Sequence, residues 1–474
     1  MSKPPAKISV APPPSHWDME IPIGVIGGGA TGLTAAAAAG YAGVECVVFE
    51  RDSTPSGSTA MSYGSICAAG TKLQQRFGLE DTTDALAEDI VAAVKGQTDA
   101  DHVRLLAEQS AVTLDWFTED LQLDFSIEPN WKGFGHRIPR LHGTPNRIGD
   151  ELMAMLLDVS SDAGATMVGD AHVTTLFQSE DGRISGLSYD SPDGSLTVGC
   201  QAVILASSGF AASPELIAQH IPELRNATYY GAEWHQGEAV QWGKSLGAAM
   251  ADLTSSQTLA NLAIPHNLVI PHTLVIDGGF TVNSDGKRFH NELVNISGQA
   301  RNVIEQTGNI GWIIYDQAGH DKASSLFAEY RNGLPVNAYR SASDIAGLAA
   351  EIGVPAGALE QTFASVSNSA TSGDAADFGR RFESEQALRA PYFAVKVTGA
   401  LFHTQGGLEI DRAARVRLDA GGVIPNLFAG GGAARSVSGP SDWGYLPGIG
   451  LCTAVSFGHL AGECAANLIK QGRC

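Results

Sequence analysis

Cysteines at metal-binding spacing, basic residues and long apolar runs are all scarce in this sequence, and each scarcity excludes a class of protein. The six cysteines are dispersed with no CxxC or CxxCH, which excludes zinc knuckles, the common iron–sulfur sites and attached c-type haem. Thirty Lys and Arg against 51 Asp and Glu give a net charge of −21, which argues against a nucleic-acid partner. No apolar run reaches membrane-spanning length, and the Pro-rich residues 1–17 lack a signal-peptide core. We therefore expect a cytoplasmic protein with a loose N-terminal arm.

The bulk composition describes a compact chain of more than one domain. Its 474 residues are 44% hydrophobic and 17% charged, which suits a large interior divided between two domains. The 55 glycines are an excess, and they cluster in short runs. Such runs indicate places where the backbone approaches a ligand closely.

The first informative motif is a Gly-rich turn between a strand and a helix. The apolar run Ile21–Ile26 predicts a strand, Gly27–Gly32 reads GGGATG, and Leu33–Ala39 predicts a helix. A second strand, Glu45–Phe49, ends on Glu50, eighteen residues after Gly32. Strand, turn, helix and strand form a βαβ unit, which requires a parallel sheet with a right-handed crossover.

The residue types of this turn match dinucleotide binding. Gly27 suits the tight turn, Gly29 admits the pyrophosphate to the backbone, and Gly32 lets helix and strand pack closely. The helix N-terminus stabilises phosphate charge, and Glu50 can accept hydrogen bonds from ribose hydroxyls. The motif predicts a dinucleotide, and it does not choose between FAD and NAD.

The Gly-rich βα pattern occurs near both ends of the chain and is interrupted between them. This arrangement predicts an α/β fold, namely a Rossmann-like domain interrupted by an inserted α+β cap. Helical periodicity or β-branched runs appear elsewhere along the chain. His266 and His272 flank one of the β-rich runs at even spacing, which would place both on one strand face. Without an acidic neighbour at ligand spacing, this pair predicts no metal site. The further predicted elements are Asp81–Leu121 and Glu151–Ala163 (helical), Ala202–Ala206 and Leu268–Ile276 (strands), and Leu451–Asn467 (helix). The predicted divisions are an arm at 1–19, a dinucleotide domain at 20–260 and 391–474, and the cap at 261–390.

Several later segments, in order, resemble one flavoprotein family, the soluble fumarate reductases and 3-ketosteroid dehydrogenases. No single segment is decisive, but their order along almost the whole chain is specific. The matching segments are GSTAMSYG at Gly57–Gly64, SSGF at Ser207–Phe210, DGKRF at Asp285–Phe289 with Glu292, HTQGG at His403–Gly407, and IPNLFAG at Ile424–Gly430.

The resemblance implies FAD, a cap domain, and hydride exchange between the flavin and a carbon beside an activated centre. It implies non-covalent FAD, because no histidine occurs between Ser58 and Gly64 to form a histidyl–flavin bond. The residues that it places at the cofactor are Gly27, Gly29, Ala30, Thr31, Gly32, Glu50, Arg51, Ser58, Thr59, Ala60, Ser62, Tyr63, Gly64, Val173, Ser207, Gly209, Gly431, Gly432, Gly450 and Leu451.

Departures from the family pattern bear on the substrate. The fumarate reductases carry an arginine that acts as the proton donor, and alignment from Lys287 gives Ile296 at that position. They hold a substrate carboxylate with a second arginine, in a segment that reads DWGYLPG here, at Asp442–Gly448. Arg301 and Arg435 lie nearby in sequence, but neither falls on the matching position. A dicarboxylate needs opposing cations, because an unpaired carboxylate in a dry site is costly. Dicarboxylate reduction is therefore disfavoured, though not excluded.

The segment from Gly444 to Leu451 instead resembles the ketosteroid and cyclic-ketone dehydrogenases. In that branch a tyrosine hydroxyl and a glycine N–H polarise the substrate carbonyl, and Tyr445 and Gly450 match them. The resemblance also places His403 beside the flavin as a donor to the substrate carbonyl. Gly448 to Gly450 begin a predicted helix, and its N-terminal N–H groups can stabilise negative charge on the reduced flavin. Tyr63 is a weaker candidate base, and the tyrosine of the middle domain is missing. The general base is thus unassigned.

Alternative functions remain open at this stage. The favoured hypothesis is α,β-dehydrogenation of a cyclic ketone or related small carbonyl compound, with an unidentified electron acceptor. The second is fumarate-reductase-like reduction of an unsaturated carboxylate, using Arg301 or Arg435. The third is a flavin-binding electron carrier or sensor without turnover. Tyr445 and His403 also have structural interpretations, as a packing aromatic and as a donor to a backbone carbonyl.

Overall fold

The computed structural model describes residues 7–472, which divide into two compact units. Unit 1 contains the described residues up to Ile221, Gly231–Ser256, and the chain from His403 onward. Unit 2 contains Pro222–Tyr230 and Gln257–Phe402. The segment predicted as the cap, 261–390, falls inside unit 2, which extends beyond it at both ends.

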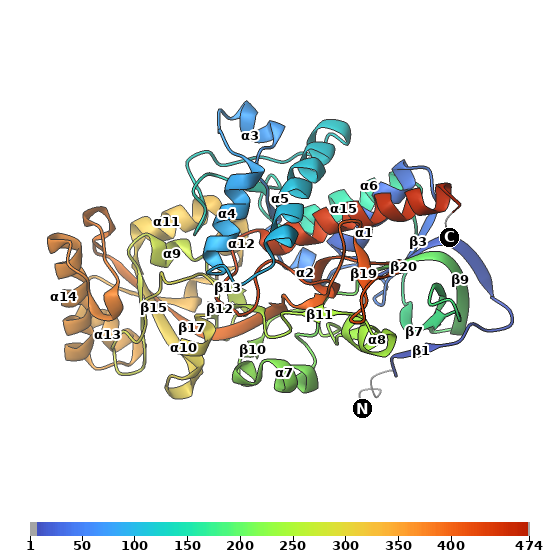
Figure 1. Ribbon diagram of the computed structural model, residues 1–474. Helices are drawn as coiled ribbons and strands as arrows, with labels where there is room; N and C mark the ends of the chain where they lie inside the picture. Colours follow the sequence, from blue (N-terminus) through green and yellow to red (C-terminus); the bar gives the residue numbers. More distant parts are fainter. Residues whose placement is uncertain (1–6, 473–474) are drawn as a thin grey trace. The chain divides into compact units, whose positions relative to one another are not determined.

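Unit 1 is built on a nine-stranded sheet of order β1-β7-β8-β9-β2-β3-β6, with β20 beside β9 and β19 beside β20 (Figure 1). The strands β3, β2, β9 and β20 run parallel, as the βαβ motif predicts. The strands of unit 1 are β1 (Ser9–Ala11), β2 (Met19–Ile26), β3 (Cys46–Phe49), β4 (Ser65–Cys67), β5 (Leu141–Gly143), β6 (Thr166–Val168), β7 (His172–Gln178), β8 (Ile184–Ser191), β9 (Gly194–Leu205), β11 (Met250–Ala251), β18 (Gly407–Leu408), β19 (Arg415–Arg417) and β20 (Val423–Ala429).

Two long apolar helices of unit 1, α1 and α15, pack side by side (Figure 1). Small residues at their contact allow this close packing. A side chain at Gly458 would lie 2.5 Å from the Thr31 carbonyl oxygen, and a side chain at Gly462 would overlap the Ala35 carbonyl oxygen. The helices of unit 1 are α1 (Ala30–Tyr41), α2 (Gly57–Ala60), α3 (Lys72–Arg76), α4 (Thr83–Ala93), α5 (Ala100–Asp115), α6 (Gly149–Asp162), α7 (Pro214–His220), α8 (Glu238–Leu246) and α15 (Ile449–Lys470).

The length of α15 corrects one expectation. Contrary to the absence of membrane-length runs expected from the sequence, its 22 residues are long and apolar enough to cross a membrane. However, 67% of its most apolar window is buried inside the structure. A core helix passes the same test of length and composition, and the packing of α15 against α1 and α5 has that character.

Two further sequence predictions are wrong in detail. The N-terminal arm is not loose throughout, since β1 pairs in parallel with β7 and the Ser9 and Thr175 hydroxyls lie 3.0 Å apart. The run Leu268–Ile276 is not one strand. Its strand β13 covers Leu268–Val269, and the helix α9 follows His272, because Pro271 between them cannot donate to a sheet. His266 and His272 therefore do not share a strand face.

Unit 2 combines a second, seven-stranded sheet with several helices. The long strand β17 lies at its centre, paired antiparallel with β15 and β16. Its core includes Phe280, Ile314, Leu348 and Phe382. The elements are β10 (Thr228–Tyr229), β12 (Ser256–Ala263), β13 (Leu268–Val269), β14 (Phe280–Val282), β15 (Gly311–Asp316), β16 (Tyr339–Ala342), β17 (Tyr392–Thr404), α9 (Thr273–Ile276), α10 (Ala300–Ile304), α11 (Gln317–Leu326), α12 (Ala328–Gly333), α13 (Ile345–Ile352) and α14 (Ala356–Ser372).

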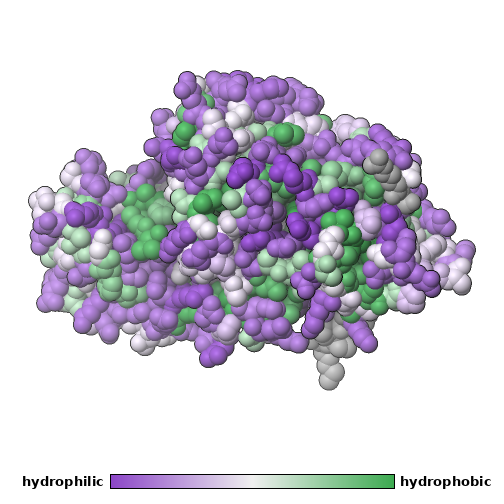
Figure 2. Space-filling view, in the orientation of Figure 1, coloured by the Kyte–Doolittle hydropathy of each residue, from purple (hydrophilic) through white to green (hydrophobic). Residues whose placement is uncertain are grey.

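The face of the surface shown in Figure 2 is mostly polar. Hydrophilic residues predominate there, and hydrophobic residues form smaller areas among them.

Candidate functional site

The carboxyl ends of four parallel strands of unit 1 meet at one edge of its sheet. Gly27 follows β2, Glu50 follows β3, Ala206 follows β9 and Gly430 follows β20. Ligands of open α/β sheets bind at this edge. The Gly-rich turn, the acidic residue and two further Gly-containing segments are therefore brought to one place from distant parts of the sequence.

The Gly27–Gly32 turn has the backbone that its glycines predict. Gly27 has φ +105, and a side chain there would lie 2.5 Å from the Ala206 carbonyl oxygen. A side chain at Gly32 would overlap the Gly27 carbonyl oxygen, so α1 packs directly on the end of β2. Beside Gly29, by contrast, the nearest atom is the Thr59 hydroxyl oxygen, 3.6 Å from an added Cβ. That open space at the start of α1 is where a phosphate group fits.

Charged side chains next to this turn are held in place. The Glu50 carboxylate accepts hydrogen bonds from the backbone N–H groups of Gly28, at 2.6 Å, and Asp52, at 3.1 Å. Arg51 forms an ion pair with Glu238 and donates to His172 Nε2 at 2.6 Å. These contacts bring the start of β7 next to β3.

Several other residues predicted at the cofactor lie close to this turn or to one another. A side chain at Gly431 would overlap the Thr31 hydroxyl, and one at Gly432 would lie 2.8 Å from the Gly209 nitrogen. Ser207 Oγ, two residues before Gly209, is buried with no hydrogen-bond partner among the described residues. Close backbone approaches with an orphaned hydroxyl fit a bound dinucleotide such as FAD.

The remaining predicted positions also belong to unit 1. The Thr59 hydroxyl of α2 accepts a hydrogen bond from the Ala30 N–H at the start of α1, at 3.0 Å. Gly64 has φ +55 and accepts from the Thr144 N–H at 3.2 Å. The others lie in or next to the same elements: Ser58 and Ala60 in α2, Ser62 and half-buried Tyr63 after it, Val173 in β7, and Leu451 in the first turn of α15.

His403, Tyr445 and Gly450 converge in unit 1, although 47 residues separate the first from the last. A Cβ at Gly450 would lie 3.3 Å from the Tyr445 hydroxyl oxygen and 3.4 Å from His403 Nε2. The Gly450 N–H also donates a hydrogen bond to the Tyr445 hydroxyl. Gly448, with φ +79, is the N-cap of α15, so Gly450 lies in the first turn of that helix.

Burial fixes the protonation states of this cluster at neutral pH. Burial raises the pKa of the Tyr445 hydroxyl to about 12, so it keeps its proton. Burial lowers the pKa of His403 to about 4, so its imidazole is neutral. His403 Nδ1 contacts the Gln405 side-chain amide at 2.8 Å and the Thr404 carbonyl oxygen at 3.4 Å. The neutral Tyr445 hydroxyl and the neutral His403 ring thus lie beside Gly450, at the N-terminus of α15.

The sequence interpretation missed the contributions of Gln405 and His235. Gln405 lies two residues after His403 and was quoted only as part of the HTQGG match. His235 is 7% exposed, and its Nε2 lies 3.9 Å from a Cβ built at Gly57. Burial, together with the nearby His403, lowers the pKa of His235 to about 4. A lone histidine before a helix gives no sequence signal of this position.

The arginines proposed for a dicarboxylate are already engaged by acidic residues. Arg301 donates to Glu223 at 2.7 Å in unit 2. Arg435 donates to Asp252 at 2.7 Å in unit 1 and lies 3.4 Å from Glu409. Neither guanidinium is thus left with its charge uncompensated.

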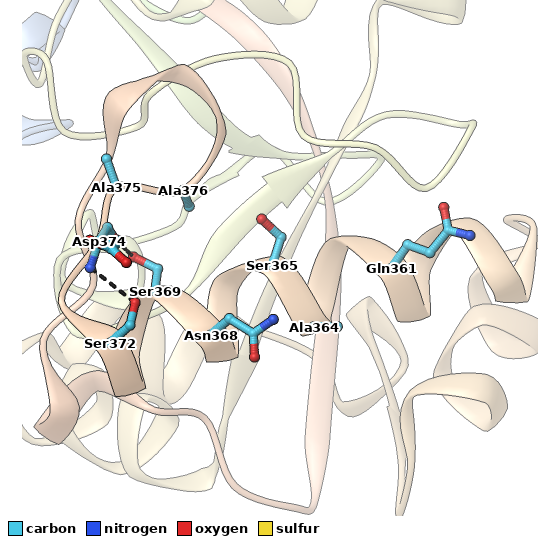
Figure 3. A pocket seen from close by; sticks show the side chains of 9 residues that line it. All are labelled: Gln361, Ala364, Ser365, Asn368, Ser369, Ser372, Asp374, Ala375 and Ala376. Carbon is cyan, nitrogen blue, oxygen red and sulfur yellow. Dashed lines mark hydrogen bonds between the residues drawn. The ribbon is translucent and has the colours of Figure 1, made fainter.

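A surface pocket of about 470 Å³ lies elsewhere, against α14 of unit 2 (Figure 3). Small and polar residues line it, among them Ser365, Asn368 and Ser372. It has no cationic or aromatic lining residue to hold a dinucleotide. Within residues 7–472, no three His, Cys, Asp or Glu side chains are grouped so that they could hold a metal ion.

The buried histidines predict acid sensitivity. Burial lowers the pKa of His142, His235 and His403 to about 4, against about 6.5 in the unfolded chain. Between these values the unfolded state binds more protons, so stability is fully present above about pH 6.5 and falls as pH decreases towards 4. Urea unfolding from pH 7.5 to 4.5 at constant ionic strength should show this slope. The slope should decrease in His142→Gln and persist in His16→Gln, at an exposed position. Equal slopes in all three proteins would contradict the assignment.

Comparison with known proteins identifies the family of this chain. Residues 23–451 match the family model described as FAD binding domain. A probable fumarate reductase of Shewanella frigidimarina is 28% identical, over 93% of this chain and 74% of its own length. A 4-oxocyclohexanecarboxylate 2-dehydrogenase of Sinomonas cyclohexanicum is 25% identical, over 96% of this chain and 94% of its own.

Solved structures show the same fold over nearly the whole chain. The open conformation of a flavocytochrome c3 fumarate reductase has a TM-score of 0.81 at 27% identity, covering 96% of this chain and 79% of that one. A 3-ketosteroid-Δ4-(5α)-dehydrogenase of Rhodococcus jostii RHA1 has a TM-score of 0.74 at 25% identity, covering 95% and 98%. The chain therefore belongs to the FAD binding domain family, as an FAD-dependent oxidoreductase of the class that acts on CH–CH groups.

Proposed function

We propose that this oxidoreductase removes the α and β hydrogens of a small cyclic ketone or related carbonyl compound. The observation that carries the proposal is the convergence of the Tyr445 hydroxyl, His403 Nε2 and the Gly450 amide. Neutral donors at one point suit an oxygen that becomes negative during reaction, because they stabilise that charge more in the transition state than in the ground state.

The chain's own residues would polarise the substrate. The Tyr445 hydroxyl accepts from the Gly450 N–H, so its own proton is available to the substrate carbonyl oxygen. His403, in contact with Gln405, would supply a second donor from Nε2 in the tautomer that carries the proton on that nitrogen. Both donors lower the barrier to loss of the α-proton, because negative charge develops on the carbonyl oxygen as that proton leaves. The bound flavin would accept the β-hydrogen as hydride.

The relatives support both a ketone and an unsaturated acid. The Sinomonas and Rhodococcus proteins are named for ketone substrates, whereas the Shewanella protein is named for fumarate. Reduction of an unsaturated carboxylate is thus the second candidate. The ion pairs of Arg301 with Glu223 and of Arg435 with Asp252 favour the ketone, since neither arginine is left to bind a dicarboxylate.

We also propose that FAD is bound without a covalent link. No histidine lies between Ser58 and Gly64, the segment that carries the resemblance to the flavoproteins. Acid precipitation should therefore release all yellow colour into the supernatant. Colour retained in the pellet would contradict this.

The half-buried Tyr63 stays a predicted candidate base.

A substrate screen tests the function directly. Under anaerobic conditions, cyclic ketones should bleach the oxidised flavin of the purified protein, with formation of the conjugated enone. Fumarate and urocanate should fail to reoxidise the protein after reduction by a viologen dye. Reoxidation by either acid, without bleaching by any ketone, would replace the proposal with the second candidate.

A further inference from the structure

One buried arginine of unit 1 differs from the others in its partners. Among the described residues, four arginines are buried: Arg140, Arg147, Arg288 and Arg380. Arg140 is paired with Asp81 and Asp89, while Arg288 and Arg380 share Glu292. Arg147 makes no ion pair within residues 7–472. Its charged head donates to Ser65 Oγ at 3.3 Å and lies 5.5 Å from the centre of the Trp131 ring.

Such a charge is costly to keep unless something neutralises it. Arg147 is 8% exposed, and burial lowers the pKa of its guanidinium. Glu128 is the acidic residue that acts on it electrostatically, but only from beyond ion-pair distance. Arg147 also has φ +55, a backbone conformation that residues other than glycine rarely adopt. Strained positions of this kind cluster at functional sites.

The β4–β5 pair places Arg147 near the carbonyl-polarising cluster. Ser65 faces Gly143 across this antiparallel pair, and Cys67 faces Leu141. A side chain at Gly143 would overlap the Arg147 guanidinium, whereas one at Gly448 would lie 2.7 Å from the Leu141 side chain and 3.1 Å from Cys67 Cβ. Both contacts therefore lie on one face of the pair.

The distance between the two ends of that face is short. Residues two apart on a strand lie ~7 Å apart. The step from Ser65 to Cys67 therefore separates Arg147 from the segment that carries Tyr445 and Gly450. A single ring with a ketone at one end and an anionic group at the other matches such a spacing.

We propose that Arg147 binds the carboxylate of the substrate, and that the substrate is a cyclic keto acid rather than a neutral ketone. This inference rests on the proposed function, which supplies the ketone end. A guanidinium pairs with a carboxylate through two parallel N–H···O bonds. One such arginine suits a monocarboxylate, whereas a dicarboxylate needs cations at both ends.

A matched pair of substrates tests the inference. We compare 4-oxocyclohexanecarboxylate with its methyl ester, which keeps the ketone and removes the charge. The wild-type protein should prefer the acid by about 10- to 100-fold in kcat/KM, the range of a hydrogen-bonded charge. In Arg147→Gln this ratio should fall to near one, mainly through KM. The control Arg104→Gln removes an exposed arginine and should keep the ratio.

A binding measurement gives a second readout that does not need turnover. Cyclohexanecarboxylate should perturb the flavin absorbance of the oxidised holoenzyme and bind Arg147→Gln about 10- to 100-fold more weakly. Arg147→Lys should be intermediate, because a lysine keeps the charge without the paired donors. If Arg147→Gln fails to fold, the Arg147→Lys variant carries the test, and undiminished affinity there would overturn the inference.

The outcomes separate this inference from the proposed function. Equal use of acid and ester by the wild type, with undiminished binding to Arg147→Gln, overturns the role of Arg147 but leaves ketone dehydrogenation standing. No bleaching by either compound, with carboxylate binding that still depends on Arg147, supports the carboxylate site and overturns the function. A shifted flavin midpoint potential in Arg147→Gln, without a change in carboxylate affinity, would mean that Arg147 compensates the negative charge of the cofactor. That outcome overturns the inference.

Discussion

Tyr445→Phe is expected to lower kcat about 100- to 1,000-fold, the range measured when one oxyanion-stabilising donor is removed. The substitution removes one buried hydroxyl and keeps the ring, which is 9% exposed and lies 6.1 Å from the His403 ring, centre to centre. The Gly450 N–H then loses its acceptor, and the substrate oxygen loses its nearest donor. FAD content should stay at the wild-type level, because Tyr445 is not among the residues predicted at the cofactor.

A measurement of proton exchange separates polarisation from later steps. In D2O, the enzyme should exchange the α-protons of a cyclic ketone, and Tyr445→Phe should slow this exchange in parallel with kcat. The control is Tyr189→Phe, which removes the hydroxyl of another buried tyrosine of unit 1, on β8. The control should react at the wild-type rate. Unchanged turnover and exchange in Tyr445→Phe would show that the carbonyl binds elsewhere.

Local patterns predicted the first strand, the Gly-rich turn and the first helix well. The apolar run before Gly27 and the small residues after it give the turn and α1, because strand and helix periodicities are properties of neighbouring residues. The pairing of β20 with β9 joins residues more than 200 positions apart. No spacing rule predicts that contact. The resemblance of Ile424–Gly430 to known flavoproteins assigned this segment to the dinucleotide domain without predicting its strand partner.

The missed site residues depend on tertiary contacts. Gln405 offered a signal only through its place in the HTQGG segment, two positions after His403 and just beyond the end of β17. His235 offered none, because its place beside Gly57 and His403 is fixed only by folding. Arg147 resembles any other arginine in the sequence. Its distinguishing property is the absence of an ion-pair partner among the described residues, which only coordinates can reveal.

The misassigned elements have local causes. Pro271 interrupts an apolar run that otherwise predicts a strand, and the chain enters α9 after His272. The Pro-rich arm looks unstructured from composition, yet Ser9–Ala11 adds an edge strand to β7. Three residues of edge pairing are too few to leave a period in the sequence.

Gly32→Ala is expected to destabilise the protein by about 3 kcal/mol or more, whereas Gly29→Ala, three residues earlier, should leave the fold intact. Alanine is the better helix former by about 1 kcal/mol, which favours the substitution at Gly32 in the first turn of α1. The new methyl group would overlap the Gly27 carbonyl oxygen, however, so α1 must move away from β2. The free-energy cost of this steric overlap outweighs the gain in helix propensity. A loss of this size is a large part of a typical folding free energy of about 5–15 kcal/mol.

At Gly29 the backbone has φ −78, which alanine adopts readily, and the nearest atom to an added Cβ is the Thr59 hydroxyl oxygen at 3.6 Å. Its methyl group would instead project into the space left for the pyrophosphate, so FAD affinity should fall about tenfold or more while apo-protein stability changes by about 1 kcal/mol or less. Thermal unfolding of the apo-proteins and FAD titration by fluorescence quenching distinguish the two effects. A stable, fully yellow Gly32→Ala protein would show that the turn relaxes around the methyl group, and wild-type FAD affinity in Gly29→Ala would place the pyrophosphate away from the start of α1.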